Sequence, residues 1–259
     1  MDLELSGRTA VVTAASKGIG LAITRALAGA GAHVVAGAQR STAELDELAD
    51  GGRVRFVPVN LADPAGPGTL TEAAGARIDI LVNNVGSARP RPGGFLSITE
   101  ADWEASLTLN LLAAVRTTRG ALPVMLAAGR GSIITICSVN ARLPDPSVLD
   151  YSTAKGGLAA FSKALSKEVG PRGIRVNTVS PGPVATELWL GRGGVAETVG
   201  AATGATPEDV QSEAAGQMVT GRFTRPAEVA DLVLYLAGDR AGNITGAEFV
   251  IDGGLIPTW

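Results

Sequence analysis

The sequence is poor in the residue types that most often support metal and thiol chemistry. Among its 259 residues it has one cysteine, Cys137, and one histidine, His33. A single cysteine forms no intrachain disulfide, and a single histidine excludes a multi-histidine metal site and leaves a Ser-His-Asp mechanism only one base. We therefore expect proton transfer to use other side chains, and we interpret Cys137, at the end of an apolar run, as a packing residue in a buried strand.

An excess of positive charge is also missing. Lys and Arg total 22 and Asp and Glu total 25, for a formal charge of −3, and the basic residues form no run. The general attraction to nucleic-acid phosphates is therefore absent, and we expect no nucleic-acid partner. The N-terminus, Met1–Leu5, is acidic where a signal peptide is positive, and no apolar run approaches the roughly 20 residues of a membrane span. We predict a cytoplasmic protein that does not bind a membrane.

Nothing in the composition indicates disorder or a division into domains. Hydrophobic residues make up 46% of the chain, and 34 Gly with 14 Pro stay below the share of roughly 25–30% that marks low-complexity sequences. No linker, internal repeat or charge block interrupts the pattern. At roughly 150 residues per domain, this length also fits one large unit. We predict a single domain over residues 1–259.

Short β-branched apolar runs alternate with longer helical patterns. The helical patterns include Gly18–Gly29, Thr99–Leu126 and Ser152–Val169. Such alternation predicts an α/β fold, a doubly wound, Rossmann-like parallel sheet of seven strands with helices on both faces. The predicted strands are Thr9–Thr13, His33–Ala36, Arg53–Pro58, Ile78–Asn83, Gly131–Cys137, Arg175–Ser180 and Glu248–Ile251.

Residues 186–221 interrupt this alternation with a glycine-rich, partly helical insertion. Within it, Thr206–Asp209 has the features of a helix start, namely an N-cap threonine, a first-turn proline and acidic residues at the positive helix end. The insertion follows a predicted strand end, where segments that cover ligands commonly lie. We predict that residues 186–221 form a substrate lid.

The turn after the first predicted strand has the pattern of a dinucleotide-binding site. Gly18 and Gly20 open a predicted helix, whose unpaired N–H groups and positive dipole end can bind a pyrophosphate. Tight helix–strand packing without a ligand would also explain these glycines. If a dinucleotide binds here, we expect Ser16, Lys17, Gly18, Ile19 and Gly20 to contact it.

The acidic residue that usually binds the adenosine ribose is absent. In dinucleotide-binding folds it follows the glycine turn by about 20 positions, where this chain has Ala38 and then Gln39 and Arg40. No carboxylate would repel a 2′-phosphate there, and Lys17 and Arg40 are positive. We predict NADP(H) in preference to NAD(H), with Gln39 and Arg40 among the contacts. Solvated surface cations are the alternative interpretation.

Three polar residues form a candidate catalytic group. Tyr151 and Lys155 are four positions apart at the start of a helical pattern, so both project from one face. A neighbouring ammonium and a cationic nicotinamide would lower the tyrosine pKa from its usual value near 10. Ser138 follows a buried strand at the edge where ligands bind, and its hydroxyl can polarise a carbonyl.

Together these features resemble the short-chain dehydrogenase/reductase family in its common form of roughly 250 residues. The resemblance covers nearly the whole chain, and its motifs occur in the family's order and spacing. They are Thr13–Gly20, Asn60-Leu61, Asn83–Gly86, Asn110, Ser138, Tyr151 with Lys155, Pro181-Gly182 and Ile251–Gly254. One residue departs from the pattern, because Ala14 stands where the family usually has glycine and places a Cβ in the tight bend.

The resemblance implies a role for each catalytic residue. Tyr151 would be the general acid in reduction and the general base in oxidation, and Ser138 would hydrogen-bond the substrate oxygen. Lys155 would bind the nicotinamide ribose and lower the Tyr151 pKa, and Asn110 would hold a water in a proton relay. The further cofactor contacts that it implies are Asn60 and Leu61 on the adenine, Asn84 and Gly86 near the adenosine ribose, and Pro181, Gly182, Val184 and Thr186 over the nicotinamide.

The sequence leaves the substrate open. The apolar residues Leu188, Trp189, Leu190, Val195, Val199 and Met218, with Val139, Leu143 and Val148, would line a ketone pocket or belong to the core or a subunit contact. The spacing is most similar to 3-oxoacyl-carrier-protein reductases, for which Arg130 and Arg172 could attract an acidic acyl carrier protein. Because both arginines are commonly solvated surface residues, we rank a small-molecule ketone or secondary alcohol ahead of a carrier-bound substrate.

Two further expectations concern assembly and rival functions. The resemblance implies a homotetramer, and the apolar C-terminus, Leu255–Trp259, fits a buried interface, although a terminal Trp also packs on its own subunit. The alternative functions are a noncatalytic dinucleotide-binding sensor and a structural subunit of a larger complex. Neither needs Ser138, Tyr151, Lys155 and Asn110 together, so we rank both below the reductase.

Overall fold

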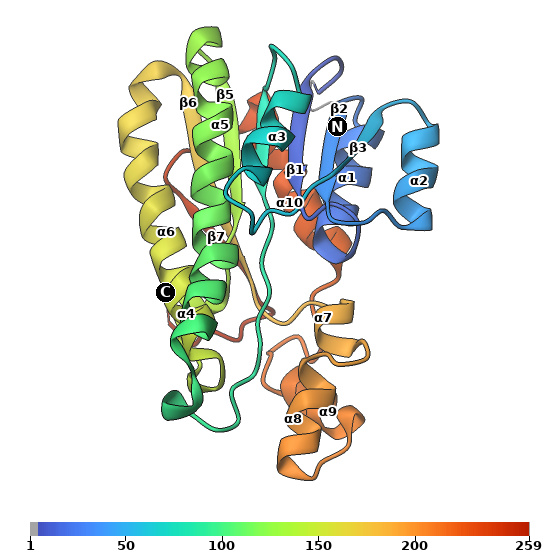
Figure 1. Cartoon of the computed structure of the whole chain (residues 1–259), viewed down its shortest axis with the longest axis vertical. Coiled ribbons are helices and arrows are strands. Elements are labelled where there is room, and N and C mark those ends of the chain that lie inside the picture. The colour runs from blue at the N-terminus through green and yellow to red at the C-terminus, as the bar shows by residue number, and fades with distance from the viewer. Residues whose placement is uncertain (1–4, 259) are drawn as a thin grey trace.

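The computed structural model describes residues 5–258 and contains a seven-stranded sheet with helices on both faces (Figure 1). The strand order is β3-β2-β1-β4-β5-β6-β7, and all pairings are parallel. This confirms the predicted fold class, with each strand end within two residues of its predicted position. The strands are β1 (Thr9–Thr13), β2 (His33–Ala38), β3 (Val54–Pro58), β4 (Ile80–Asn83), β5 (Gly131–Ile136), β6 (Ile174–Pro181) and β7 (Glu248–Ile251).

Two hydrophobic layers separate the sheet from its helices. Along β1, Val12 packs on the side of α1 and α10, whereas Val11 packs on the side of α3 and α5, as the period of two of a strand requires. Both residues are fully buried. The helices are α1 (Gly18–Gly29), α2 (Ala43–Asp50), α3 (Gly66–Ala73), α4 (Glu100–Leu107), α5 (Ala113–Ala128), α6 (Leu149–Val169), α7 (Glu187–Leu190), α8 (Val195–Thr203), α9 (Pro207–Gly216) and α10 (Pro226–Ala237).

The long helical pattern predicted over Thr99–Leu126 is a continuous helix with an irregular turn. Its α4 and α5 parts are joined by a π-helical segment, Thr108–Leu112, in which the Ala113 N–H bonds the Thr108 carbonyl. By length and composition alone, the helical stretch Glu100–Ala128 could cross a membrane, and a third of its most apolar window is buried. This corrects the expectation that no stretch approaches that length, although core helices of globular proteins pass the same test.

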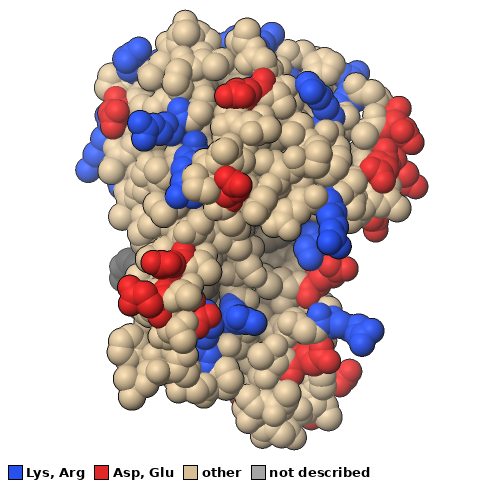
Figure 2. Space-filling model, viewed as in Figure 1, with Lys and Arg blue, Asp and Glu red and all other residues tan. Residues whose placement is uncertain are grey.

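The insertion forms a helical group beyond the carboxyl edge of the sheet. Helices α7, α8 and α9 lie together at the bottom of Figure 1. The predicted helix start is confirmed, because Thr206 and Asp209 form a capping box at the beginning of α9. In Figure 2 the surface is hollowed between this group and the rest of the protein, with basic and acidic side chains both at the rim.

The strand order fixes where a ligand site belongs. Successive strands run outward from β1 through β2 to β3, and then from β4 to β7 in the opposite direction. In open α/β sheets ligands bind beyond the carboxyl ends of the strands at such a reversal. Here the reversal lies between the ends of β1 and β4, at Thr13 and Asn83.

Candidate active site

The two strands at the reversal are fixed to each other by Thr13. Its Oγ1 accepts the N–H groups of Asn84 and Val85 at 2.8 and 3.0 Å and donates to the Val82 carbonyl at 3.3 Å. The Asn84 side-chain amide donates in turn to the carbonyl oxygens of Thr13 and Ala14, at 3.0 and 3.3 Å. Asn84, predicted from the resemblance as a cofactor contact, thus also holds the turn after β1 in place.

The predicted glycines make this turn. Gly18 has φ +54°, and a Cβ at Gly20 would lie 2.1 Å from the Ala14 carbonyl oxygen, so no other residue fits there. Helix α1 begins at Gly18 without a side-chain cap. Its first-turn N–H groups therefore face the carboxyl edge of the sheet with the positive end of the helix dipole, which fits a pyrophosphate.

Ala14, which stands where the family usually has glycine, has an unusual backbone conformation. Ala14 has φ +52° and is the one non-glycine residue with positive φ in the described part of the chain. A left-handed conformation costs an L-residue about 1–2 kcal/mol, and the entropy that glycine gains in the unfolded chain offsets about 0.4–1 kcal/mol of that. We expect Ala14→Gly to raise the free energy of unfolding by about 0.5–1 kcal/mol, measured by urea denaturation.

Ala15→Gly is the matched control for that prediction. Ala15 is fully buried and its φ is not positive. Glycine there removes a packed methyl group and adds backbone freedom, so the free energy of unfolding should fall. Equal destabilisation by both substitutions would show that the positive φ of Ala14 stores no strain.

The residues predicted for the adenine end lie at the ends of β2 and β3. The Gln39 Nε2 donates to the Asn60 Oδ1 at 3.1 Å, and both side chains are exposed. Arg40 is exposed beside them. Leu61, in contrast, is 4% exposed and packs in the core, so only a small part of its surface faces a ligand. The half-buried Ser16 accepts a 2.9 Å hydrogen bond from Thr42 through its carbonyl.

The segment predicted for the nicotinamide end runs from β6 to the start of α7. Thr186 lies against the α1 start, because a Cβ at Gly18 would come 3.3 Å from its Cγ2. The exposed Lys17 ammonium lies 3.5 Å from the Glu187 carboxylate, which adds a second contact between α1 and α7. Upstream, the buried Pro181 ends β6, the Gly182 N–H donates to the Ile251 carbonyl, and Val184 bridges to Thr224.

Tyr151 and Lys155 occupy one face in the first turns of α6, as their spacing predicts. The buried Lys155 ammonium donates to the Ile136 carbonyl at 2.9 Å and lies 5.6 Å from the centre of the Tyr151 ring. The half-buried Tyr151 hydroxyl hydrogen-bonds with Ser138, which is 7% exposed. The structure therefore brings the three residues together at the end of β5.

Asn110 reaches the same place from the π-helical segment. Its Oδ1 accepts the Ser87 N–H at 2.8 Å, and its Nδ2 donates to the carbonyls of Ser87 and Ser106 at 3.0 and 3.1 Å. Between Asn110 and Lys155 lies Gly86, whose Cβ would come 2.9 Å from the Asn110 Oδ1 and 3.3 Å from the Lys155 Nζ. Glycine at position 86 is therefore what lets the two side chains approach.

The lowered pKa predicted for Tyr151 includes the charge of a bound nicotinamide, and in the protein alone this pKa is raised. Burial raises it to about 12, and the hydrogen bond with Ser138 lowers it by less. Burial also lowers the pKa of Lys155, because an ammonium is less stable away from water. In the protein alone Tyr151 is therefore a protonated acid, and Lys155 does not bring it near neutrality.

This direction gives a spectroscopic prediction. The chain has two tyrosines, Tyr151 and Tyr235, so the difference between parent and Tyr151→Phe isolates one phenol. A raised pKa keeps Tyr151 protonated as the pH rises past about 10, the usual tyrosine value. We expect the tyrosinate absorbance of Tyr151 to stay small at that pH and to grow only toward about 12. Half-titration at or below about pH 10 would contradict this result.

Asn140 belongs to the site but is not predicted from the sequence. Its N–H donates to the Ser138 Oγ at 3.2 Å, its Oδ1 accepts the Ser138 hydroxyl at 3.2 Å, and its Nδ2 donates to the Ser152 Oγ at 3.3 Å. Asn140 therefore orients the hydroxyl beside Tyr151. Its position two residues after a candidate serine is a signal that could have indicated this contact.

The apolar residues considered for a pocket differ in exposure, and Trp189, Val195 and Val199 are half-buried. Met218, Val139 and Val148 are buried, whereas Leu188, Leu190 and Leu143 are 41–44% exposed. Trp189 stacks at a tilt on Phe223, with ring centres 5.3 Å apart. The Cys137 side chain is buried as predicted, with its Sγ 3.3 Å from the Lys155 carbonyl.

Arg130 and Arg172 do not lie near the candidate active site. Arg130 precedes β5, and Arg172 precedes β6, so both are at the amino edge of the sheet, opposite Ser138 and Tyr151. The Arg130 guanidinium also pairs with the buried Asp79 at 3.1 Å. The C-terminal Trp259 and residues Met1–Glu4 lie outside the described residues.

Comparison with known proteins agrees with this arrangement. Residues 13–256 match the family described as enoyl-(acyl carrier protein) reductase. D-threitol dehydrogenase of Mycolicibacterium smegmatis is 37% identical over 98% of this chain and 94% of its own, and 3-oxoacyl-[acyl-carrier-protein] reductase of Aquifex aeolicus is 33% identical over 98% and 100%. The crystal structure of L-sorbose reductase from Gluconobacter frateurii, complexed with NADPH and L-sorbose, superposes over the full length of both chains with a TM-score of 0.91 at 33% identity.

Proposed function

The chain belongs to the short-chain dehydrogenase/reductase family, and we propose that it is an NADP(H)-dependent oxidoreductase acting on a ketone or secondary alcohol. The observation that carries this proposal is the convergence of Ser138, Tyr151 and Lys155 at the end of β5. The relatives it matches are named dehydrogenases and reductases, which makes it an oxidoreductase rather than a sensor or a structural subunit.

The chain's own residues perform the acid–base part of the reaction. The nicotinamide supplies or accepts the hydride when it is bound. Tyr151 donates its hydroxyl proton to the oxygen of a ketone in reduction, and the Ser138 hydroxyl, which donates to the Asn140 Oδ1 in the protein alone, would turn its proton toward the same oxygen while its Oγ still accepts the Asn140 N–H. The raised pKa of Tyr151 keeps its hydroxyl protonated at neutral pH, as a proton donor must be. In the oxidative direction the tyrosine must lose its proton first, which the same pKa opposes.

Lys155 and Asn110 have supporting roles beside Tyr151. The Lys155 ammonium, fixed on the Ile136 carbonyl, is placed to bind the nicotinamide ribose and to carry charge toward the phenol. Both polar atoms of the Asn110 side chain are bonded to protein groups, so they anchor the loop at Ser87. The proton-relay water assigned to Asn110 stays a prediction.

The cofactor would lie along the carboxyl edge of the sheet. The uncapped start of α1 would bind the pyrophosphate, the Gln39–Asn60 pair and Leu61 would border the adenine, and Gly86 with Asn84 would border its ribose. The positive side chains of Arg40 and Lys17 would bind the 2′-phosphate of NADP(H). The insertion, through Thr186 against Gly18, would then close over the nicotinamide as the substrate lid.

Two substrate classes remain to be separated. The exposed Leu143, Leu188 and Leu190 would offer apolar contact to a small ketone, and relatives named for a polyol and a ketose act on small substrates. A carrier-bound 3-oxoacyl substrate is the second candidate, because several relatives are named 3-oxoacyl-carrier-protein reductases. Since Arg130 and Arg172 lie at the opposite edge of the sheet, we rank the small ketone first.

A substrate panel tests the proposal. NADPH and NADH oxidation would be followed with small ketones and ketoses, cyclic diketones and 3-oxoacyl thioesters. We expect turnover of at least one small ketone with NADPH. Turnover confined to carrier-bound thioesters would favour the second candidate, and cofactor binding without turnover of any carbonyl would overturn the oxidoreductase.

We also propose a homotetramer, as the family resemblance implies. Light scattering on the purified chain measures this directly. A mass near 26 kDa would identify a monomer and reject the tetramer.

A further inference from the structure

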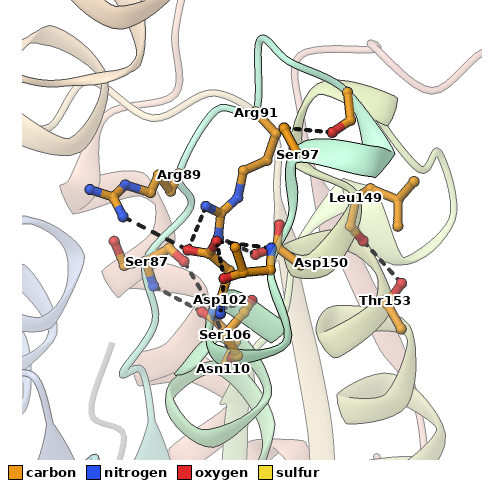
Figure 3. A network of polar contacts seen from close by, with 12 residues as sticks. Ser87, Arg89, Arg91, Ser97, Asp102, Ser106, Asn110, Leu149, Asp150 and Thr153 are labelled. Atoms are coloured by element: carbon orange, nitrogen blue, oxygen red, sulfur yellow. Dashed lines mark hydrogen bonds and ion pairs between the residues drawn. The ribbon is translucent and has the colours of Figure 1, made fainter. Parts of the chain in front are cut away.

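A partly buried ion-pair cluster lies next to the catalytic helix and plays no part in the chemistry described above. The Arg91 guanidinium contacts the Asp102 carboxylate at 2.8 Å and the Asp150 carboxylate at 2.7 Å (Figure 3). The Arg91 side chain is 11% exposed and the Asp150 side chain 3%. One side chain of the loop after β4 thus joins the first turn of α4 to the first turn of α6.

The start of α6 is held by Arg91 and by the Ser152 hydroxyl, whose Oγ accepts the Asn140 Nδ2 and the Asp145 N–H at 3.3 Å each. Tyr151 is the third residue of this helix, and the N-cap residue, Val148, makes no side-chain cap. The first turn of a helix has unpaired N–H groups and frays when nothing caps it. Arg91 contacts the chain here at two points. Its backbone N–H donates at 2.7 Å to the carbonyl of Ser147, in the 3₁₀ turn just before α6, and its guanidinium binds Asp150, the residue before Tyr151.

The same loop is fixed to the other side of the site. Its earlier residues, Gly86 and Ser87, contact Lys155 and Asn110. Lys155 lies one turn further along α6 and has its own anchor on the Ile136 carbonyl. Loosening the first turn would therefore displace Tyr151 relative to Ser138 while Lys155 stays in place.

Stability alone explains the cluster poorly. Desolvating charged groups can cost more than their attraction returns, and well-packed apolar replacements are often as stable. Among the described residues, the Arg91 Nε and the Asp150 Oδ1 are also buried without a hydrogen-bond partner. We propose that Arg91 is a positioning residue, which holds Tyr151 at Ser138 by clamping Asp150 and Asp102; this inference rests on the proposed function.

Arg91→Met tests the clamp. A small displacement of a reacting group can cost about 100-fold in rate, so we expect kcat to fall about 10- to 100-fold. The Kd for NADPH, measured by fluorescence titration, should stay within about twofold of the parent value. The substitution does not change the residues at the start of α1 and the end of β2 that would bind the cofactor. Arg89→Met is the matched control, since Arg89 belongs to the same loop, is 79% exposed and lies 4.0 Å from Asp102. Its kcat should equal that of the parent.

A double variant separates positioning from stability. Arg91→Met leaves the Asp150 charge buried and unpaired, and Arg91→Met with Asp150→Asn removes that charge. We expect the double variant to regain thermal stability while kcat stays low. A kcat that recovers together with stability, or an Arg91→Met variant with parental kcat, would overturn the clamp. If Arg91→Met does not fold, the double variant and Arg91→Lys give the same comparison. Tyr151-dependent turnover of the parent tests the proposed function independently of all these variants.

Discussion

Tyr151→Phe should abolish most of the turnover while leaving the cofactor site intact. The substitution keeps the ring that lies beside Lys155 and removes only the hydroxyl that bonds Ser138. A positioned general acid contributes about 10²–10⁴-fold in rate, so we expect kcat for ketone reduction to fall about 1000-fold. The Kd for NADPH should change by less than about threefold, because the lost hydroxyl faces the substrate oxygen. Steady-state kinetics and fluorescence titration measure the two quantities.

Tyr235→Phe is the matched control for this experiment. It removes the chain's other phenolic hydroxyl, from α10 on the opposite face of the sheet. Its kcat should stay within about twofold of the parent, since a residue away from the reacting atoms contributes no transition-state interaction. Equal losses in the two variants would mean that the tyrosine effect is structural, and full activity of Tyr151→Phe would remove Tyr151 from the mechanism.

The second large effect concerns the cofactor. Arg40 is exposed beside Gln39 at the end of β2, where a 2′-phosphate would lie. A hydrogen bond to a charged group is worth about 1.5–3 kcal/mol, so Arg40→Asp should lower kcat/KM for NADPH about 10- to 100-fold. NADH carries no 2′-phosphate, and its kcat/KM should not fall. The ratio of the two kcat/KM values is the measurement.

Arg25→Asp makes the same charge change elsewhere. Arg25 is exposed on α1, within the helix rather than at its start. This control shows whether net charge alone weakens NADPH binding, an effect that salt would screen. An Arg40→Asp variant with an unchanged NADPH-to-NADH ratio would assign Arg40 to the solvated surface.

Much of the fold could be predicted because its signals are local. Runs such as Gly131–Ile136 are β-branched and bounded by glycine or polar residues, which indicates a buried strand from the sequence alone. Gly18 and Gly20 indicate a tight turn for the same reason. The π-helical segment at Thr108–Leu112 could not be predicted, because the Asn110 side chain within it forms two of its hydrogen bonds with Ser87, 23 positions away.

The site residues also divide into those that local sequence patterns indicate and those that depend on contacts between distant positions. Tyr151 and Lys155 were found from helical spacing and Ser138 from its place after a strand, and the structure brings all three together. The rise in the Tyr151 pKa in the protein alone could not be predicted, because the extent of burial depends on the packing of the whole site. Arg91 and Asp150 are 59 positions apart, and no local pattern connects them.

Transfer of deuterium from NADPH that carries deuterium at both hydrogen positions of the nicotinamide C4 tests the central claim most directly. The enzyme, the labelled cofactor and a ketone from the active part of the panel would be incubated, and the alcohol analysed by mass spectrometry. We predict an alcohol that carries one deuterium on the former carbonyl carbon, formed by the parent and largely lost in Tyr151→Phe. Cofactor that binds tightly while no carbonyl acquires the label would contradict hydride transfer by this protein.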